Sequence, residues 1–155
     1  LYFDPRYRLP LYQTAFHDAV ITTNHWSMGT LKFSNVVQTR ELLELLYGVP
    51  PLYHLNQDGF SSLLPAIKGH YDFFSPLHRE IGALPMTSFE WLTPDRLVQR
   101  TVFGDQVEVI ANFGRQEAVL RQEHIPPRGL VVRRPGADPL TYTPKPVSRS
   151  QAAKR

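Results

Sequence analysis

The sequence contains no cysteine and no long apolar run. Without cysteine there are no disulfide bonds, thiolate zinc ligands or cysteine nucleophiles. No segment approaches the roughly 18 consecutive apolar residues of a membrane-spanning helix, so we predict no membrane partner. The opening LYFDPRYRLPLY lacks the charged, apolar and small-residue sectors of a signal peptide. The sequence also lacks an initiator methionine and begins in what looks like the middle of a fold. We therefore expect a fragment or a processed piece of a larger protein.

Several signatures of catalysis are missing as well. The chain has no GxSxG, P-loop or GxGxxG motif. The histidines form neither HExxH nor a tight His-x-His pair, and no acid is placed to complete a zinc site. We therefore predict neither a metal nor a cofactor. The six histidines are His17, His25, His54, His70, His78 and His124.

The net positive charge of the sequence comes from its last eleven residues. Of the 17 basic residues, Lys145, Arg149, Lys154 and Arg155 lie in the last eleven positions, which hold no acid. The 13 that remain in residues 1–144 are balanced by 14 acidic residues. This pattern favours a solvated tail over a nucleic-acid-binding arm, and we predict no nucleic-acid partner.

The first half of the chain has the pattern of one βα unit. Residues 14–23, TAFHDAVITT, are rich in β-branched and apolar types and predict a strand buried on both faces. Residues 34–47 predict a helix, with Ser34 as N-cap and with Gly48 and Pro50 ending it. A second helix is expected from about Pro65 to residue 74, with Pro76 bending it before a further turn or two to residue 81.

The second half changes to short runs of strand-forming residues. Turn residues separate these runs, and Gly104-Asp105 is a two-residue hairpin signal. Val107, Val109 and Ala111 alternate with their neighbours, which is typical of an antiparallel sheet with one solvated face. We predict an α+β chain with three parts. Residues 1–84 would hold strand, helix and helical linker, 85–144 an antiparallel β-sandwich and 145–155 a basic tail.

The predicted strand carries polar residues that need an explanation. His17 and Asp18 would point to opposite faces of a regular strand, so they could share a pocket only at the strand's end. There Asp18 could accept sugar hydroxyls; alternatively it is a buried aspartate paired with arginine or backbone amides. Asn24 and His25 follow, and Trp26 offers a flat face for a sugar ring or is an ordinary core tryptophan.

Other candidates have simpler interpretations. Glu41 and Glu44 are assigned to a solvated helix face. Four aromatic residues of the second helical region are assigned to the core rather than to a binding stripe, namely Phe60, Tyr71, Phe73 and Phe74.

Three segments resemble parts of a known enzyme group. RLPLYQTAFHDAVITTNHW resembles a "PLYELVYHDAVV" type of segment near the end of the catalytic barrel in glycoside hydrolase families 101 and 129. ELLELLYGVPPLYHLN is similar to their following helix and "LYGTPPL" turn. VFGDQVEVIANFG with IPPRGLVV is similar to the small β domain that closes many barrel glycosidases, a more widely shared motif. Together these segments span most of residues 7–134.

The resemblance implies a retaining glycosidase with a (β/α)₈ barrel. Its two catalytic carboxylates would lie on earlier strands that this chain lacks, so the isolated chain is expected to be inactive. Asp18 matches the aspartate of the HDAV motif and is expected to bind sugar hydroxyls, and His17 matches by position. Where relatives have a Trp-rich stretch, only Trp26 matches, which leaves the sugar open. A secreted or periplasmic location is compatible with the resemblance.

The sequence thus predicts the final βα unit, linker and closing β-sandwich of a glycoside hydrolase. Its partners would be a carbohydrate substrate of the α-N-acetylgalactosaminide type and the remainder of the barrel. Predicted substrate contacts are Asp18, His17, Trp26, His25 and Asn24, with no catalytic or metal-binding residue. The alternative is a non-catalytic β-sandwich module that recognises a glycan or a protein and folds on its own.

Overall fold

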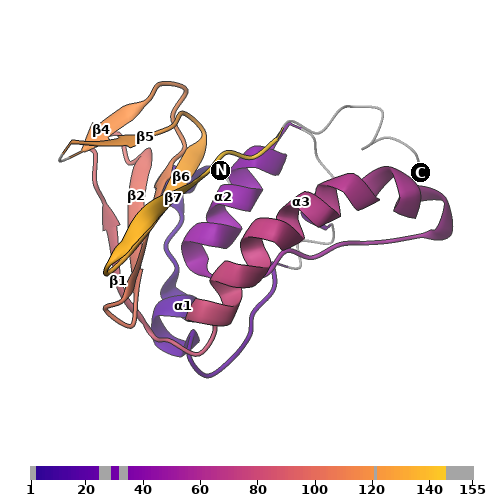
Figure 1. The fold of residues 1–155 in the computed structure, drawn as a ribbon, viewed down its shortest axis with the longest axis horizontal. Coiled ribbons are helices and arrows are strands. Elements are labelled where there is room, and N and C mark those ends of the chain that lie inside the picture. The colour runs from indigo at the N-terminus through magenta and orange to yellow at the C-terminus, as the bar shows by residue number, and fades with distance from the viewer. Residues whose placement is uncertain (1–2, 25–28, 32–34, 121, 146–155) are drawn as a thin grey trace.

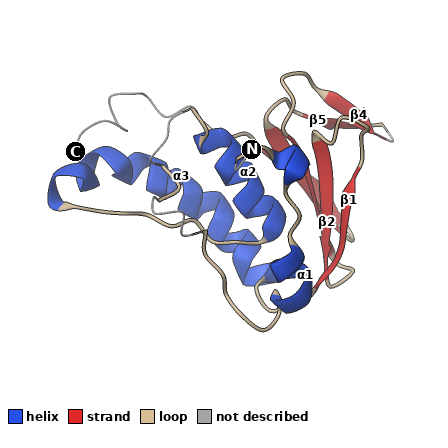
Figure 2. Ribbon diagram, turned by 180° about the vertical axis from the view of Figure 1, so that it is seen from behind, coloured by secondary structure: helices blue, strands red, loops and turns tan. Residues whose placement is uncertain are grey.

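The computed structural model has a helical layer beside a layer of strands (Figures 1 and 2). It describes residues 3–24, 29–31, 35–120 and 122–145. A short 3₁₀ turn, η1 (Pro5–Tyr7), precedes three α-helices: α1 (Leu11–Phe16), α2 (Val37–Tyr47) and α3 (Gln57–Ile81). The strands are β1 (Met86–Trp91), β2 (Val98–Phe103), β3 (Val107–Asn112), β4 (Ala118–Leu120), β5 (Glu123–Ile125), β6 (Gly129–Arg134) and β7 (Ala137–Tyr142).

Five strands form one antiparallel sheet in the order β1-β2-β3-β6-β7. The predicted turn at Gly104-Asp105 is confirmed, although three residues, 104–106, link the paired ends of β2 and β3. Both residues of the pair have positive φ, 54° and 57°, the conformation that glycine and aspartate tolerate best. β4 and β5 form a separate two-stranded sheet.

The inner face of the large sheet packs against the helices. Val107, Val109 and Ala111 face the helical layer as their alternation predicted, and they are at most 1% exposed. Leu45 and Leu46 of α2 belong to the same core. That core contains residues from both sides of position 84: Leu42, Leu43, Tyr47, Val49, Phe74, Leu77, Ile81, Met86, Phe103, Leu130 and Val132. The predicted domain division at residue 84 stays a prediction.

The outer face is shared between apolar and charged side chains. Ile110 and Val131 pack with Ile125 of β5 in a smaller apolar cluster. Beside it, Arg100 contacts Glu108 and lies 3.1 Å from Glu90. Because the second sheet has only two three-residue strands and helices cover the inner face, the α+β class is confirmed but the predicted sandwich is not.

The predicted strand over residues 14–23 is wrong. Residues 11–16 are α-helix, and residues 17–23 form a turn and irregular backbone. The amide of Thr14 donates to the Pro10 carbonyl at 2.8 Å, and that of His17 donates to the Gln13 carbonyl at 3.0 Å. A strand obtains its backbone hydrogen bonds from a neighbouring strand, whereas these bonds are local. The predicted final strand of a barrel is therefore not confirmed.

The two longer helices differ from prediction mainly at their ends. α2 begins at Val37, later than predicted, and the proposed N-cap Ser34 lies outside the described residues. It ends as predicted at Gly48, whose φ of 66° is left-handed. α3 runs through both Pro65 and Pro76. Apolar residues recur at helical spacing across Pro76, and burial of residues 77 and 81 outweighs the lost backbone hydrogen bond.

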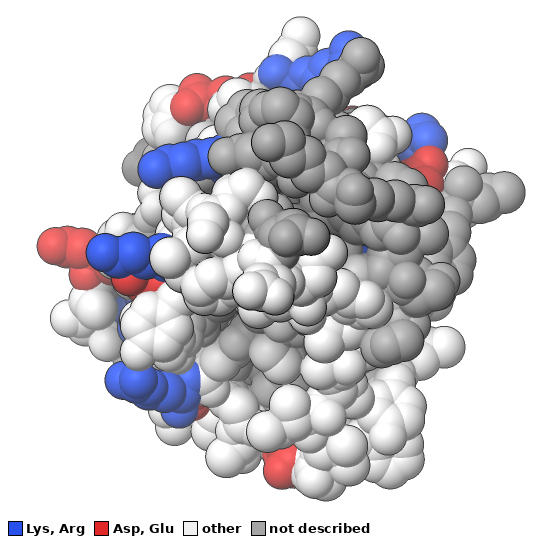
Figure 3. Space-filling view, turned by 90° about the vertical axis from the view of Figure 1, so that its right-hand side faces the viewer, with Lys and Arg blue, Asp and Glu red and all other residues white. Residues whose placement is uncertain are grey.

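No helix among the described residues is long and apolar enough to cross a membrane. Figure 3 shows the right-hand face of the molecule, where Lys and Arg side chains lie at intervals around the margin, several of them beside acidic ones.

Candidate functional site

His17 is a buried link between three parts of the chain. Its Nδ1 atom lies 2.7 Å from the Leu84 carbonyl oxygen, so this nitrogen carries a proton and donates it. Its Nε2 atom lies 3.3 Å from the Gly48 carbonyl oxygen. The ring also contacts Phe103, with centroids 4.7 Å apart. His17 therefore fastens the turn after α1 to the ends of α2 and α3.

Gly48 allows His17 to lie this close. A Cβ added at Gly48 would collide with His17 Nε2, and the left-handed φ already disfavours other residues. We expect Gly48→Ala to lower the free energy of unfolding by at least about 2 kcal/mol. Chemical denaturation measures this loss. If His17 is first replaced by alanine, the collision is removed, so Gly48→Ala should then cost clearly less stability. An equal loss of stability with and without His17 would show that the two residues are not in contact.

The structure describes three of the five predicted contacts, and these three differ in exposure. Asp18 is exposed in the turn after α1, whereas its neighbour His17 is 7% exposed and points inward. Asn24 is half-buried, and its Nδ2 atom is buried with no hydrogen-bond partner among the described residues. The predictions for His25 and Trp26 lie outside the described residues. The roles of all five in substrate binding stay predictions.

A chain of buried polar side chains links α2 to its neighbours. The imidazole of His70 on α3 lies between Tyr53 and Glu41: Nδ1 is 2.6 Å from the Tyr53 hydroxyl, and Nε2 is 2.9 Å from Glu41 Oε1. The Tyr142 hydroxyl of β7 donates to the other oxygen, Glu41 Oε2, at 2.8 Å. These four hydrogen-bonded side chains thus connect the loop after α2, both long helices and the last strand.

Glu44 lies one turn further along α2 and is also fully buried. The Thr30 hydroxyl lies 3.0 and 3.2 Å from its two carboxyl oxygens and accepts a hydrogen bond from the Leu52 amide at 3.0 Å. Burial raises the pKa of Glu44 to about 8, although Thr30 and the nearby Arg40 partly oppose this shift. The interpretation of Glu41 and Glu44 as a solvated helix face is therefore wrong, because α2 is covered on every side.

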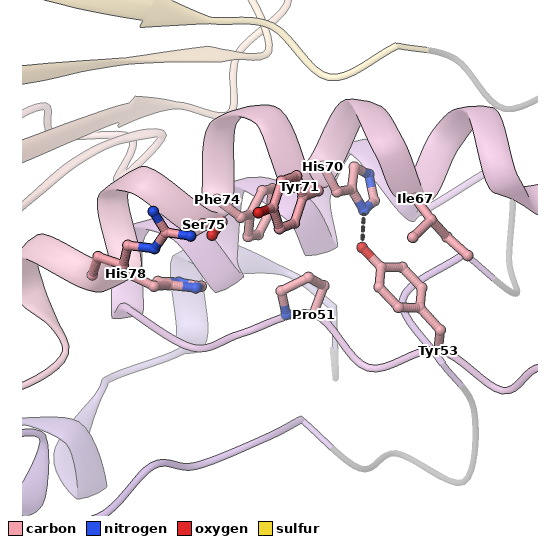
Figure 4. Close-up of a pocket in the computed structure, with 9 residues that line it drawn as sticks. Pro51, Tyr53, Ile67, His70, Tyr71, Phe74, Ser75 and His78 are labelled. Atoms are coloured by element: carbon pink, nitrogen blue, oxygen red, sulfur yellow. Dashed lines mark hydrogen bonds between the residues drawn. The ribbon is translucent and has the colours of Figure 1, made fainter.

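A groove of about 400 Å³ lies between α3 and the loop around Pro51 (Figure 4). Tyr53 and Pro51 of the loop face residues of α3, and the Tyr53–His70 hydrogen bond holds the loop against the helix. The α3 residues that line it are Ile67, His70, Tyr71, Phe74, Ser75, His78 and Arg79. Of the four aromatics assigned to the core, Phe74 is buried, but Tyr71 is 60% and Phe60 44% exposed.

His78 lies at one end of this groove. Its Nε2 atom is buried and has no hydrogen-bond partner among the described residues. Burial, with a smaller contribution from His17, lowers the pKa of His78 to about 4. The side chain is therefore a neutral imidazole near pH 7, able to donate or accept one hydrogen bond from a molecule in the groove.

His70 also lines a second, more polar cavity of about 570 Å³. Glu41 and Tyr142 contribute to its wall, and Phe73 stacks on Tyr142 with ring centroids 4.5 Å apart. Its other lining residues are Pro65, Ala66, Gly69, Asp72, Thr141, Thr143 and Lys145. The Glu41–His70 pair thus stands between two cavities.

The order Glu41–His70–Tyr53 resembles a carboxylate–imidazole–nucleophile relay in its connectivity. Burial, and the carboxylates Glu44 and Glu41 nearby, raise the pKa of Tyr53 well above its usual range. Tyr53 therefore keeps its proton and is a poor nucleophile. Among the described residues no group of three or more His, Cys, Asp or Glu side chains could hold a metal ion. With Tyr53 protonated, the Glu41–His70–Tyr53 arrangement supports positioning of the loop rather than nucleophilic attack by Tyr53.

The sequence did contain one signal for this cluster. His70 stands at helical spacing with Phe74, Leu77 and Ile81, so it lies in the apolar stripe of α3 and had to be buried. Its partners Glu41 and Tyr142 come from distant segments, and only the packed structure identifies them.

Comparison with known proteins gives a family. No curated protein matches the chain. The model of the family described as glycosyl hydrolases related to GH101 family, GH129, matches residues 1–102. That range includes the HDAV and LYGVPP motifs, all three helices and β1, and it covers well over half of the chain. The chain therefore belongs to the GH101-related glycosyl hydrolase family GH129, which implies a carbohydrate substrate.

Proposed function

We propose that this chain is the C-terminal part of a retaining glycoside hydrolase that acts on α-N-acetylgalactosaminide-like substrates. The observation that carries the proposal is the family match, which includes the segment around Asp18. In this proposal the catalytic carboxylates belong to the rest of the barrel, and the present chain supplies substrate contacts.

The exposed surface of the N-terminal segment supports a further contact with the rest of the enzyme. Large apolar side chains between residues 9 and 21 are 46–80% exposed, although exposing them to water is unfavourable. Burial against the remainder of the barrel would cover them. They are Leu9, Leu11, Tyr12, Phe16, Val20 and Ile21.

Asp18 lies within this segment and is itself exposed. An ionised carboxylate there can accept hydrogen bonds from two sugar hydroxyls, and such charge-assisted bonds are stronger than neutral ones. Bonds that strengthen as the oxocarbenium-like transition state forms would contribute to catalysis. Of the remaining predicted contacts, Asn24, His25 and Trp26 would border the same site, whereas the buried His17 would hold in place the turn that carries Asp18.

Asp18→Asn in the complete enzyme should lower kcat/KM by more than about tenfold, which corresponds to about 1.4 kcal/mol of transition-state stabilisation. The amide keeps the side-chain volume and removes the charge. Steady-state kinetics on an aryl α-N-acetylgalactosaminide measures the effect. Asp105→Asn, in the exposed β2–β3 turn, is the matched control and should leave the rate unchanged. An unchanged rate for Asp18→Asn would remove this residue from the site.

The isolated chain should not hydrolyse the same substrate. Turnover by the 155 residues, abolished by a substitution within them, would show that the catalytic groups lie in this chain. That outcome would contradict the proposal that the catalytic carboxylates belong to the rest of the barrel, but it would not change the family assignment.

A second function is favoured by one observation, the apolar core shared by the helices and the sheet. A non-catalytic module that recognises a glycan or a protein would fold cooperatively as a monomer, as such a core allows. Thermal unfolding followed by both far-UV circular dichroism and tyrosine fluorescence distinguishes the two. Coincident transitions of a monomer favour the module, and aggregation through the exposed apolar segment favours the missing barrel.

A further inference from the structure

The groove in Figure 4 is separate from the proposed role of Asp18 and has a chemical character of its own. Its walls are mostly aromatic and aliphatic. Phe74 lies at its base with 2% exposure, whereas Tyr71 stands at its edge with 60% exposure. Aromatic walls of this kind bind the flat face of a ring, either the C–H face of a sugar or another aromatic ring.

The position of the loop across the groove is set by hydrogen bonding. Tyr53 is held by His70, which in turn donates to the buried Glu41 carboxylate. Because these three side chains are fixed before anything binds, the wall formed by Tyr53 needs little ordering on binding.

Two polar groups of the groove have no partner in the described part of the chain. One is the buried Nε2 atom of His78. The other is the exposed guanidinium of Arg79, which forms no ion pair with a described residue. A buried nitrogen without a partner is costly, and a hydroxyl in the groove would satisfy it in either tautomer, because a hydroxyl both donates and accepts.

The charge of the lining indicates the charge of the ligand. Among the described residues no aspartate or glutamate lines the groove, and Arg79 is the one arginine or lysine that does. Arginine binds carboxylates through two parallel hydrogen bonds. A neutral imidazole at His78 can donate or accept one hydrogen bond without adding a charge.

We propose that this groove binds a six-membered ring that carries a single carboxylate. The ring lies against Tyr71 and Pro51, the carboxylate pairs with Arg79, and a ring substituent hydrogen-bonds to His78 Nε2. An acidic sugar and an aromatic acid share this chemistry. The proposal does not rest on the hydrolase activity, so its failure would leave the proposed function untouched.

The test is an NMR titration of the 155-residue chain with glucuronate and, separately, with 4-hydroxybenzoate. Saturable shifts of the His78 and Tyr71 signals are expected for at least one of them, and the stronger binder identifies the source. Glucose and 4-hydroxybenzamide are the neutral counterparts. They should bind roughly tenfold more weakly, because they lack the charge-assisted bonds to Arg79. Equal binding of acid and neutral compound would overturn the assignment of an anion.

Two substitutions locate the site. Tyr71→Ala should weaken binding about fivefold or more, and Arg79→Gln should abolish the preference for the acid. Phe60→Ala is the matched control, since Phe60 is another exposed aromatic of α3 that does not line the groove. Both aromatic positions are exposed, so the fold should survive. Absence of saturable shifts, or equal weakening by Tyr71→Ala and Phe60→Ala, would overturn the proposal.

Discussion

Replacing Glu41 with alanine should lower the free energy of unfolding by about 3–5 kcal/mol, because it breaks a buried pair on one side only. His70 Nε2 and the Tyr142 hydroxyl would both lose their acceptor, and His70 is itself buried. For a chain of this length the loss corresponds to a decrease in Tm of roughly 10 °C. Thermal and urea denaturation measure both quantities.

An exposed ion pair on a neighbouring helix provides the control. Glu80 of α3 pairs with Arg134 at 2.6 Å, yet its side chain is 36% exposed. Glu80→Ala should therefore cost no more than about 1 kcal/mol. Glu41→Gln keeps the shape and one acceptor oxygen and should fall between the two. If Glu41→Ala and Glu80→Ala lower the free energy of unfolding by similar amounts, the buried hydrogen bonds of Glu41 contribute no more to stability than an ion pair on the surface.

Glu44→Gln should change how stability depends on pH. The folded pKa of Glu44 is about 8, against an ordinary value of 4.5. Between these values the unfolded chain loses the proton while the folded chain keeps it, so the contribution of Glu44 is fully present below about pH 4.5 and is lost as pH rises toward 8. Glutamine cannot ionise. The free energy of unfolding of the variant, relative to that of the wild type, should therefore rise by up to about 1.4 kcal/mol per pH unit in that window.

Urea denaturation of both proteins from pH 4.5 to 8.5 measures this difference. The variant must be compared with the wild type, because His78 also makes stability depend on pH, in the opposite direction. Its lowered pKa makes the free energy of unfolding fall as pH drops from 6.5 toward 4. Subtraction removes the His78 contribution, which both proteins share. Parallel stability profiles across the whole range would show that Glu44 titrates normally in the folded state.

Much of the fold could be predicted because the signals are local. The turn at Gly104-Asp105, the alternation along β3 and the end of α2 at Gly48 each depend on residues that are neighbours in the chain. The family was also recognisable from short motifs within residues 1–102. These features follow from backbone preferences and from side-chain periodicity, which do not require a partner segment.

The errors arose where distant segments decide the outcome. The composition of residues 14–23 favours a strand, but no strand among the described residues pairs with them, and local hydrogen bonds form α1 over residues 11–16 instead. Glu41 and Glu44 have the residue type of a solvated face, and only packing against α3 and the sheet shows that they are buried.

The sequence by itself determined the strand module, the end of α2, the absence of cysteine chemistry and the family. Only the tertiary structure decided that His17 is a buried link while Asp18 faces solvent, and that Tyr53, His70, Glu41 and Tyr142 form one hydrogen-bonded chain. The physical reason is that a buried polar side chain must find its partner wherever the fold places one, and sequence distance does not limit that choice. Tyr142 reaches Glu41 from 101 residues away.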